Sequence, residues 1–194
     1  MGIIDHTFDI LKPYLDDCND MLELGCQEFM LSDGIRPAKP YFESLGINHI
    51  SIDLEECFGA LKIDLTEDLN FRNDFDIVTN FGTSEHCMKQ YPVFLNMHKA
   101  CRVGGYLFNW VPKVDNWPEH GYYTYRPTFF EFLSNMFGYS IVLSDETATC
   151  NNTIDGWTLY TIMRKTGEST RPVNYITNDE GEYLMAEHLK RDKK

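Results

Sequence analysis

The sequence lacks the features that mark membrane and secreted proteins. It has no apolar run of membrane-spanning length, no recognisable signal peptide and no Cys-x-x-Cys pair. We therefore expect no membrane partner, a cytoplasmic location and reduced thiols throughout. The six cysteines are scattered, at positions 18, 26, 57, 87, 101 and 150.

Basic residues are also scarce. Seventeen Lys and Arg stand against 30 Asp and Glu, which gives a formal net charge of −13, and no basic cluster precedes the last few residues. Such a surface repels the phosphates of nucleic acid, so nucleic acid is not expected as a partner. Without a His-Glu-x-x-His motif or a Cys/His cluster, no metal is expected either. The charge is compatible with a small molecule, a protein partner or a cationic cofactor.

The chain is long enough for one compact domain. Its 194 residues are 43% hydrophobic and 14% aromatic, which is typical of a globular protein. We assign residues 1–165 to a single domain. Residues 166–194 are polar and charged and are expected to form a C-terminal tail, with a short helix near 182–189. No pattern indicates the oligomeric state.

Seven short apolar runs bounded by turn residues predict strands, and several are continuous, as in strands covered on both faces. They are residues 21–24, 49–53, 60–64, 75–80, 104–111, 139–144 and 157–163. Helical patterns cover residues 5–17, 37–45, 83–101 and 127–137. Pro37 and Pro127 suit first helical positions, and glycine follows each of those two helices. Pro92 is expected to kink or split the helix that contains it.

Strands alternate with helices over the first two-thirds of the chain, which predicts β-α-β units and a parallel sheet. The last two strands are joined by residues 145–156, too few for a helical crossover, so they should pair antiparallel. Residues 53–60 are similarly short, so one crossover helix is reduced or absent. The predicted fold is an α/β three-layer sandwich with a mostly parallel seven-stranded sheet whose last strand is antiparallel.

Polar residues and glycines end several of the predicted strands. Because the carboxyl ends of parallel strands share one edge of a sheet, we expect a ligand site there. Asp53 follows Gly25 by 28 residues and is placed to accept hydrogen bonds from both hydroxyls of a ribose. Asp64 is placed to accept from an exocyclic amine, with capping of its own turn as the alternative.

Five segments occur in an order and spacing that resemble class I S-adenosylmethionine-dependent methyltransferases. They are ELGC at 23–26, SIDLEE at 51–56, KIDL at 62–65, FDIVTNFGTSEH at 75–86 and ACRVGGYLF at 100–108. The resemblance covers residues 18 to 165. It implies a Rossmann-like fold, S-adenosylmethionine as cofactor, and an enzyme of EC 2.1.1 type that methylates an oxygen or nitrogen of a small molecule.

The resemblance also implies roles for residues at the strand ends. Glu23 and Gly25 would lie beside the methionine moiety, and Asp53 would hold the ribose. The adenine would contact Leu54, Asp64 and Leu65, and the methyl-transfer side would be lined by Asn80 and Phe81. A cleft with several carboxylates suits a cofactor that carries a sulfonium and an ammonium.

Two segments are candidates for contact with the methyl acceptor: residues 83–86, and residues 110–126, where such methyltransferases often carry a substrate-covering insertion. His120 is the candidate general base. Each has an alternative, since Glu85 and His86 suit a helix start, and the aromatic residues and His120 suit ordinary packing. The candidate substrate-binding residues are Glu85, His86, Trp110, Trp117, Tyr122, Tyr125 and Arg126.

The loop after the first strand departs from the family pattern. Gln27 and Phe29 stand where further glycines are usual, and they must bend away or replace the backbone contacts that glycine permits. A second hypothesis is therefore a catalytically inactive, methyltransferase-like binding or regulatory protein. A third, a nicotinamide-dependent reductase, lacks its Gly-x-Gly-x-x-Gly loop and its Tyr-x-x-x-Lys pair.

Several methyltransferase subclasses are excluded by missing residues. The chain reads TNFGTS after the fourth strand, without the Pro-Pro-Tyr of enzymes that methylate amino groups of bases or of glutamine. It has no Pro-Cys pair there, as cytosine carbon methylation would require. The acidic metal ligands of catechol-type enzymes are also missing.

Overall fold

The computed structural model describes residues 2–117, 119–150, 153–167 and 177–191. The strands are β1 (Ile3–Ile4), β2 (Asp20–Leu24), β3 (Glu28–Leu31), β4 (Gly34–Pro37), β5 (Asn48–Asp53), β6 (Leu61–Lys62), β7 (Phe75–Phe81), β8 (Cys101–Pro112), β9 (Tyr123–Tyr125), β10 (Tyr139–Cys150), β11 (Thr153–Lys165) and β12 (Leu189–Arg191). The helices are α1 (Asp5–Leu11), α2 (Lys39–Ser44), α3 (Gln90–Ala100), α4 (Pro127–Phe137) and α5 (Asn178–Ala186), with 3-10 turns η1 (Lys12–Tyr14) and η2 (Ser84–His86).

The central sheet has seven strands in the order β10-β11-β8-β7-β2-β5-β6. Strands β6, β5, β2, β7 and β8 pair in parallel, and β11 is antiparallel to both β8 and β10. The predicted mostly parallel sheet with an antiparallel last strand is therefore confirmed. Strand order reverses between β2 and β7, which is the topological switch point where sheets of this kind bind ligands.

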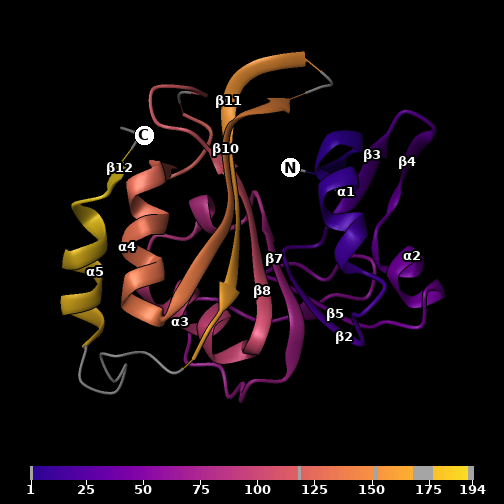
Figure 1. Ribbon diagram of the computed structural model, residues 1–194, viewed down its shortest axis with the longest axis horizontal. Coiled ribbons are helices and arrows are strands. Elements are labelled where there is room, and N and C mark those ends of the chain that lie inside the picture. The colour runs from indigo at the N-terminus through magenta and orange to yellow at the C-terminus, as the bar shows by residue number, and fades with distance from the viewer. Residues whose placement is uncertain (1, 118, 151–152, 168–176, 192–194) are drawn as a thin grey trace.

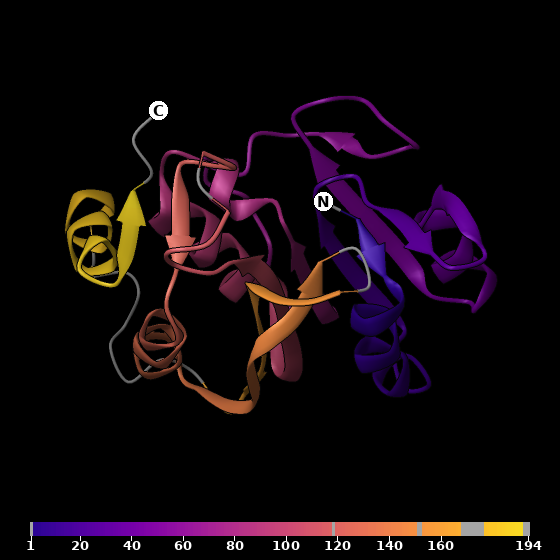
Figure 2. The same cartoon turned by 90° about the horizontal axis from the view of Figure 1, so that it is seen from above.

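Each face of the sheet has its own hydrophobic core, which completes three layers (Figures 1 and 2). On one face α3, α4 and α5 contribute Phe94, Phe130 and Met185. On the other face α1, β3 and α2 contribute Leu11, Phe29 and Phe42. Strand β7 is buried along its whole length, as its continuous apolar run predicted. No helix in the described part of the chain has the length and apolarity needed to cross a bilayer.

The predicted helix ends agree closely with the structure for α4 and less closely for α3. Helix α4 begins at Pro127 and ends before Gly138, whose φ of 74° is a left-handed conformation that suits glycine. The predicted helix over 83–101 is split into η2 and α3. Pro92 lies in the first turn of α3, where its missing N–H removes no intrahelical hydrogen bond.

The largest departure from the expected elements follows β2. No element was predicted between residues 24 and 37, but the chain forms the hairpin β3–β4 there, and β3 also pairs with β1 in a separate three-stranded sheet. Pro37 therefore ends β4 and does not begin the predicted helix. Only the six-residue helix α2 then leads into β5. The two-residue turn is Ser32-Asp33, followed by Gly34 at the start of β4, and these turn-forming residues were the sequence signal for the hairpin.

The C-terminal residues pack onto the domain. Helix α5 lies against α3, with the Tyr91 backbone N–H donating to Glu182 Oε1 at 2.7 Å. Strand β12 pairs antiparallel with β9, which directly precedes α4. Thr177 caps α5 by accepting from the Glu180 N–H.

A buried histidine predicts loss of stability in mild acid. His98 stacks on Phe137, and its Nδ1 lies 3.2 Å from the Tyr139 hydroxyl. Burial, together with the positive charges of Lys165 and Lys99, lowers the pKa of His98 to about 3. Between that pKa and the ordinary value near 6.5 the unfolded chain binds one more proton than the folded chain, so stability falls as pH falls.

We expect His98 to remove about 2 kcal/mol of stability between pH 7 and pH 5. Thermal melts over that range should show a steeper fall in Tm for the wild type than for His98→Gln, whose side chain does not titrate. Equal slopes for the two proteins would contradict a buried, neutral His98.

Candidate active site

A cavity of about 250 Å³ opens at the carboxyl ends of β2, β5 and β7, across the switch point. Its lining comes from three stretches of chain: the loop after β2, the segment after β5, and the turn after β7. The lining residues are Gly25, Cys26, Gln27, Asp53, Leu54, Asp64, Leu65, Gly82, Thr83, His86 and Cys87.

Gly25 allows the loop after β2 to turn tightly beside the cavity. Its φ is +80°, and its N–H donates to the Ile52 carbonyl at 2.7 Å. A Cβ at this position would collide with the side chains of Thr83 and Gln27. Gly25 therefore combines a left-handed backbone with close approach of neighbouring groups, the two conditions that require glycine.

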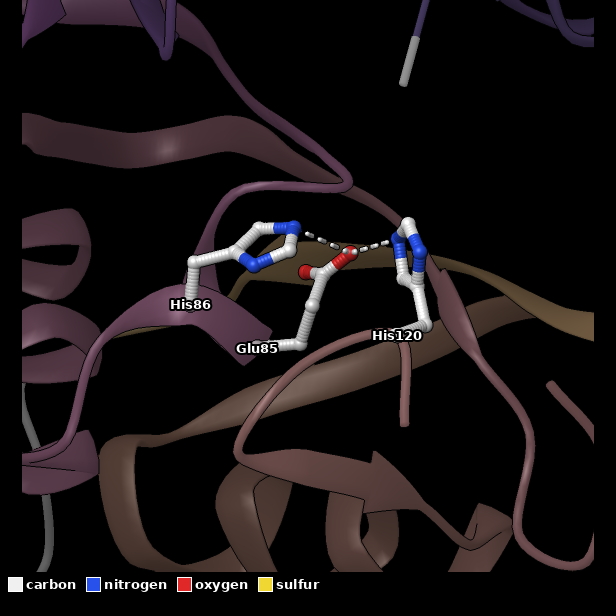
Figure 3. Close-up of side chains that lie close together, drawn as sticks. All are labelled: Glu85, His86 and His120. Carbon is white, nitrogen blue, oxygen red and sulfur yellow. Dashed lines mark ion pairs between the residues drawn. The ribbon is translucent and has the colours of Figure 1, made fainter. Parts of the chain in front are cut away.

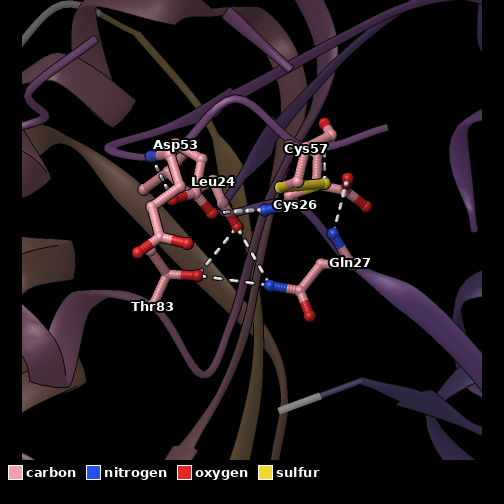
Figure 4. The surroundings of a disulfide bond; sticks show 8 residues. Leu24, Cys26, Gln27, Asp53, Cys57 and Thr83 are labelled. Atoms are coloured by element: carbon pink, nitrogen blue, oxygen red, sulfur yellow. Dashed lines mark hydrogen bonds between the residues drawn. A yellow bond between two sulfur atoms is a disulfide. The ribbon is translucent and has the colours of Figure 1, made fainter. Parts of the chain in front are cut away.

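Gln27 spans the switch point. Its Nε2 donates to the Leu24 carbonyl and to Thr83 Oγ1, both at 3.3 Å, so it links the ends of β2 and β7 (Figure 4). Its Oε1 is buried and accepts no hydrogen bond from the described residues. Phe29, by contrast, turns away from the cavity and is buried against Phe8 and Phe42. Of the two unusual residues, only Gln27 affects the cavity.

Asp53 ends β5 at the centre of the cavity wall. One carboxylate oxygen accepts from the Cys26 N–H at 2.8 Å and the other from the Glu55 N–H at 3.0 Å. A carboxylate offers about four acceptor positions, so two remain for a ligand. These hydrogen bonds fix the side chain and tie the two loops together.

Asp64, Leu54 and Leu65 complete the β5–β6 side of the cavity. Asp64 is exposed, and its Oδ1 accepts from both the N–H and the hydroxyl of Thr66 at 2.8 Å, which is the turn-capping arrangement. Its Oδ2 has no such partner among the described residues. Leu65 is buried and Leu54 is exposed.

Three of the predicted cofactor residues lie outside the cavity lining. Glu23 is buried beneath the loop, where its carboxylate accepts from the Gln27 N–H at 3.3 Å and lies 3.8 Å from His49 Nε2. Asn80 is buried and hydrogen-bonds to both the N–H and the hydroxyl of Ser84, which fixes η2. Phe81 packs in the core near Tyr160.

Cys26 and Cys57 are joined by a disulfide with a Cα–Cα distance of 6.2 Å (Figure 4). The expectation that all cysteines are reduced thiols is therefore wrong for this pair. The two residues follow β2 and β5, which are neighbours in the sheet, so they meet although they lie far apart in sequence. Cys18, Cys87 and Cys101 are free.

Cys87 lines the cavity but is not an activated nucleophile. Burial, together with the negative charges of Asp64, Glu85 and Asp53, raises the pKa of Cys87 to about 12. The thiol is therefore protonated at neutral pH, and only the thiolate is nucleophilic. The same three carboxylates make the cavity a negative environment that favours a cationic ligand.

Glu85, His86 and His120 come together beside the cavity, which His86 also lines (Figure 3). The Glu85 Oε1 lies 3.6 Å from His120 Nε2 and 3.9 Å from His86 Nε2. Trp117 stacks on His120 with 3.9 Å between ring centroids. The structure thus brings both predicted acceptor segments to one place.

The other predicted acceptor residues lie away from the cavity wall. Trp110 is buried in the core, and Arg126 is exposed just before α4. Tyr125 is fully buried, where its hydroxyl lies 2.7 Å from both Ser84 Oγ and Gln90 Oε1. Burial and then the Glu85 charge raise the pKa of Tyr125 well above its ordinary value, so it stays neutral. Tyr122 is partly buried, and its N–H donates to the Glu85 carbonyl at 2.7 Å.

No protein-family model matches the chain, and no curated protein is detectably similar in sequence. Solved structures are similar. The 1,6-didemethyltoxoflavin-N1-methyltransferase of Burkholderia thailandensis, bound to 1,6-didemethyltoxoflavin and S-adenosylhomocysteine, superposes with a TM-score of 0.62 at 18% identity, covering 82% of this chain and 76% of that one.

Two further methyltransferases have the same architecture. A SAM-dependent methyltransferase from Archaeoglobus fulgidus gives a TM-score of 0.58 at 15% identity, covering 82% of this chain and 92% of its own. Another from Aquifex aeolicus gives 0.54 at 13%, covering 80% and 87%. The chain therefore has the Rossmann-like fold of class I S-adenosylmethionine-dependent methyltransferases.

Proposed function

We propose that the protein is an S-adenosylmethionine-dependent methyltransferase that acts on an oxygen or nitrogen of a small molecule. The observation that carries the proposal is Asp53, which lines the cavity at the end of β5, is held there by two backbone N–H groups and keeps acceptor capacity for a ligand. This is the position and chemistry that recognise the two hydroxyls of a ribose.

The other cavity residues suit the remaining parts of the cofactor. Leu54 and Leu65 offer apolar surface to an adenine, and Asp64 Oδ2 can accept from its amino group. Gly25 gives backbone room for the methionine end. The bound cofactor supplies an electrophilic methyl group on a sulfonium, and the carboxylates of the cavity favour that positive charge.

The acceptor side of this site is formed by the Glu85, His86 and His120 cluster. Methyl transfer is a displacement that gains most from alignment and exclusion of water, and a base is needed only for a protonated acceptor. His120 stays our candidate for that base, and its Nε2 lies 3.6 Å from Glu85 Oε1.

Calorimetric titration with S-adenosylmethionine tests the proposal directly. We expect one site per chain, with competition by S-adenosylhomocysteine. No heat of binding at millimolar cofactor would remove the proposal, because the fold would then be retained without its ligand.

Gln27 sets the affinity at the methionine end. The cavity is somewhat smaller than the roughly 300–1,000 Å³ typical of ligand sites, and the Gln27 side chain lies across it. We expect Gln27→Ala to tighten cofactor binding about three- to tenfold, since its two hydrogen bonds are long and its Oε1 has no partner among the described residues.

Two other outcomes of the Gln27→Ala titration are informative. Weaker binding by the variant would mean that Gln27 itself contacts the cofactor. Binding by the variant but not by the wild type would favour the second candidate function, a methyltransferase-like binding protein whose site is closed by this residue. Thr83→Ser, which keeps the hydroxyl that Gln27 contacts, serves as the control.

A further inference from the structure

Two segments of the chain bring one carboxylate and two imidazoles together beside the cavity. Glu85 and His86 lie on η2, and His120 lies in the connection between β8 and β9. Their ligand atoms all lie within 4.8 Å of one another (Figure 3). Because His120 lies far from Glu85 and His86 in the sequence, the three residues do not form a local metal-binding motif.

The carboxylate of Glu85 lacks the partners that burial demands. The side chain is 0% exposed, and neither oxygen accepts a hydrogen bond from the described residues. Burying a charged group without such partners is costly, so buried charges in proteins are paired or coordinate metals. The Glu85 Oε1 lies 3.6 Å from His120 Nε2 and 3.9 Å from His86 Nε2, which are ion-pair distances for a protonated imidazole but too long for hydrogen bonds.

The loop that carries His120 is held against Glu85 by its backbone. The Tyr122 N–H donates to the Glu85 carbonyl at 2.7 Å, and a Cβ on Gly121 would lie 2.9 Å from Glu85 Cγ. Asp115, Trp117 and Glu119 all have positive φ, a strained conformation for residues other than glycine. The loop that brings His120 to within 3.6 Å of the Glu85 carboxylate therefore contains several residues with a strained backbone.

We propose that Glu85, His86 and His120 form a binding site for one divalent transition metal ion, with Zn²⁺ as the simplest case. Metal–ligand bonds of about 2.0–2.2 Å place tetrahedral ligand atoms roughly 3.3–3.6 Å apart. The two distances from Glu85 Oε1, 3.6 and 3.9 Å, need only a small contraction to reach this geometry, and the two imidazole nitrogens lie within 4.8 Å of each other. Two imidazoles and one carboxylate select Zn²⁺, Co²⁺ or Fe²⁺ over Mg²⁺, which prefers oxygen ligands.

The fourth coordination position of this ion would face the cavity. His86 belongs both to the cluster and to the cavity lining, and its side chain is 45% exposed. Three protein ligands with one open position is the arrangement of catalytic rather than structural zinc. With a metal bound, the Nε2 of His120 would be a ligand and not a proton acceptor, so the metal site replaces the general-base role considered above.

Metal binding is tested on the full chain by titration with Co²⁺ and Zn²⁺. We expect one equivalent of Co²⁺ to bind and to produce visible absorption bands, Zn²⁺ to displace it, and millimolar Mg²⁺ to leave the bands unchanged. Glu85→Gln and His120→Ala should each weaken binding at least ~100-fold, since even loss of a residue that only supports a ligand costs about 10–100-fold.

The control is His188→Ala, which removes an imidazole that likewise stacks on an aromatic ring, that of Phe132, outside the cluster. It should bind Co²⁺ as the wild type does. Absence of stoichiometric binding by the wild type, or full affinity in both cluster variants, would overturn the site. Binding of S-adenosylmethionine is measured in a separate titration, so failure of the metal site can be distinguished from failure of the proposed function.

A second measurement does not require the metal. A buried Glu85 carboxylate without a bound cation should destabilise the fold. Glu85→Gln, which removes the charge, should therefore stabilise the metal-free protein and raise Tm by about 2–4 °C. Added Zn²⁺ should then raise the Tm of the wild type but not of the variant. A lower Tm for metal-free Glu85→Gln would contradict the inference that Glu85 lacks a partner.

Discussion

Replacing Asp53 with alanine is expected to abolish measurable binding of S-adenosylmethionine. In the proposed function the carboxylate accepts both ribose hydroxyls, and each hydrogen bond to a charged acceptor contributes about 1.5–3 kcal/mol. Their joint loss weakens binding at least ~100-fold. The substitution also frees the Cys26 N–H, which Asp53 Oδ2 accepts at 2.8 Å, so the loop beside the cofactor is loosened.

Two further variants separate these effects. Asp53→Asn keeps one oxygen for the Cys26 N–H but loses the charge and an acceptor, and we expect an intermediate loss of affinity. Glu56→Ala removes an exposed carboxylate from the same loop and should bind as the wild type does. Calorimetry that found wild-type affinity in Asp53→Ala would place the binding site for S-adenosylmethionine away from Asp53.

Replacing Lys165 with methionine is expected to destabilise the fold by about 3 kcal/mol. Lys165 ends β11 and is only 2% exposed. Its ammonium donates to Asn73 Oδ1 at 2.8 Å and to the His98 and Cys101 carbonyls at 2.9 and 2.8 Å. The two carbonyls lie at the C-terminal end of α3, where a positive charge also interacts favourably with the helix dipole.

Thermal melts should show this loss as a fall in Tm of roughly 6–12 °C. Lys62→Met, at an exposed lysine on β6, should change Tm little. The variant has a second signature, because the Lys165 charge contributes to the lowered pKa of His98. Lys165→Met should therefore lose less stability on acidification than the wild type. A Tm within one or two degrees of the wild type would show that the buried ammonium is dispensable.

The central sheet was predictable because its strands depend on local patterns. Apolar runs mark β7, which is buried along its whole length, and the second half of β8, where residues 107–112 are buried. Turn residues such as Gly138 mark element ends for reasons of backbone conformation alone. Short elements were missed where pairing supplies the stability: β1 has two residues, and β9 and β12 have three each.

The candidate site was predictable only in part. Asp53 and Gly25 stand at the ends of predicted strands, so the strand pattern of the sequence was enough to predict that they line the cavity. Trp110 and Tyr125 were expected at the acceptor side on composition, but burial in this domain takes large aromatic side chains into the core. The approach of His120 to Glu85 depends on a loop conformation that no periodicity encodes.

The pairing of β9 with β12 has a consequence for the order in which the protein is completed during synthesis. The last residue that lines the cavity is Cys87. Strand β9, which follows the His120 loop, pairs with β12, and β12 consists of residues 189–191. At about 5–20 residues per second, roughly 5–20 s separate the emergence of these parts from the ribosome. In a nascent chain, all the residues that line the cavity therefore emerge before the strand that pairs with β9.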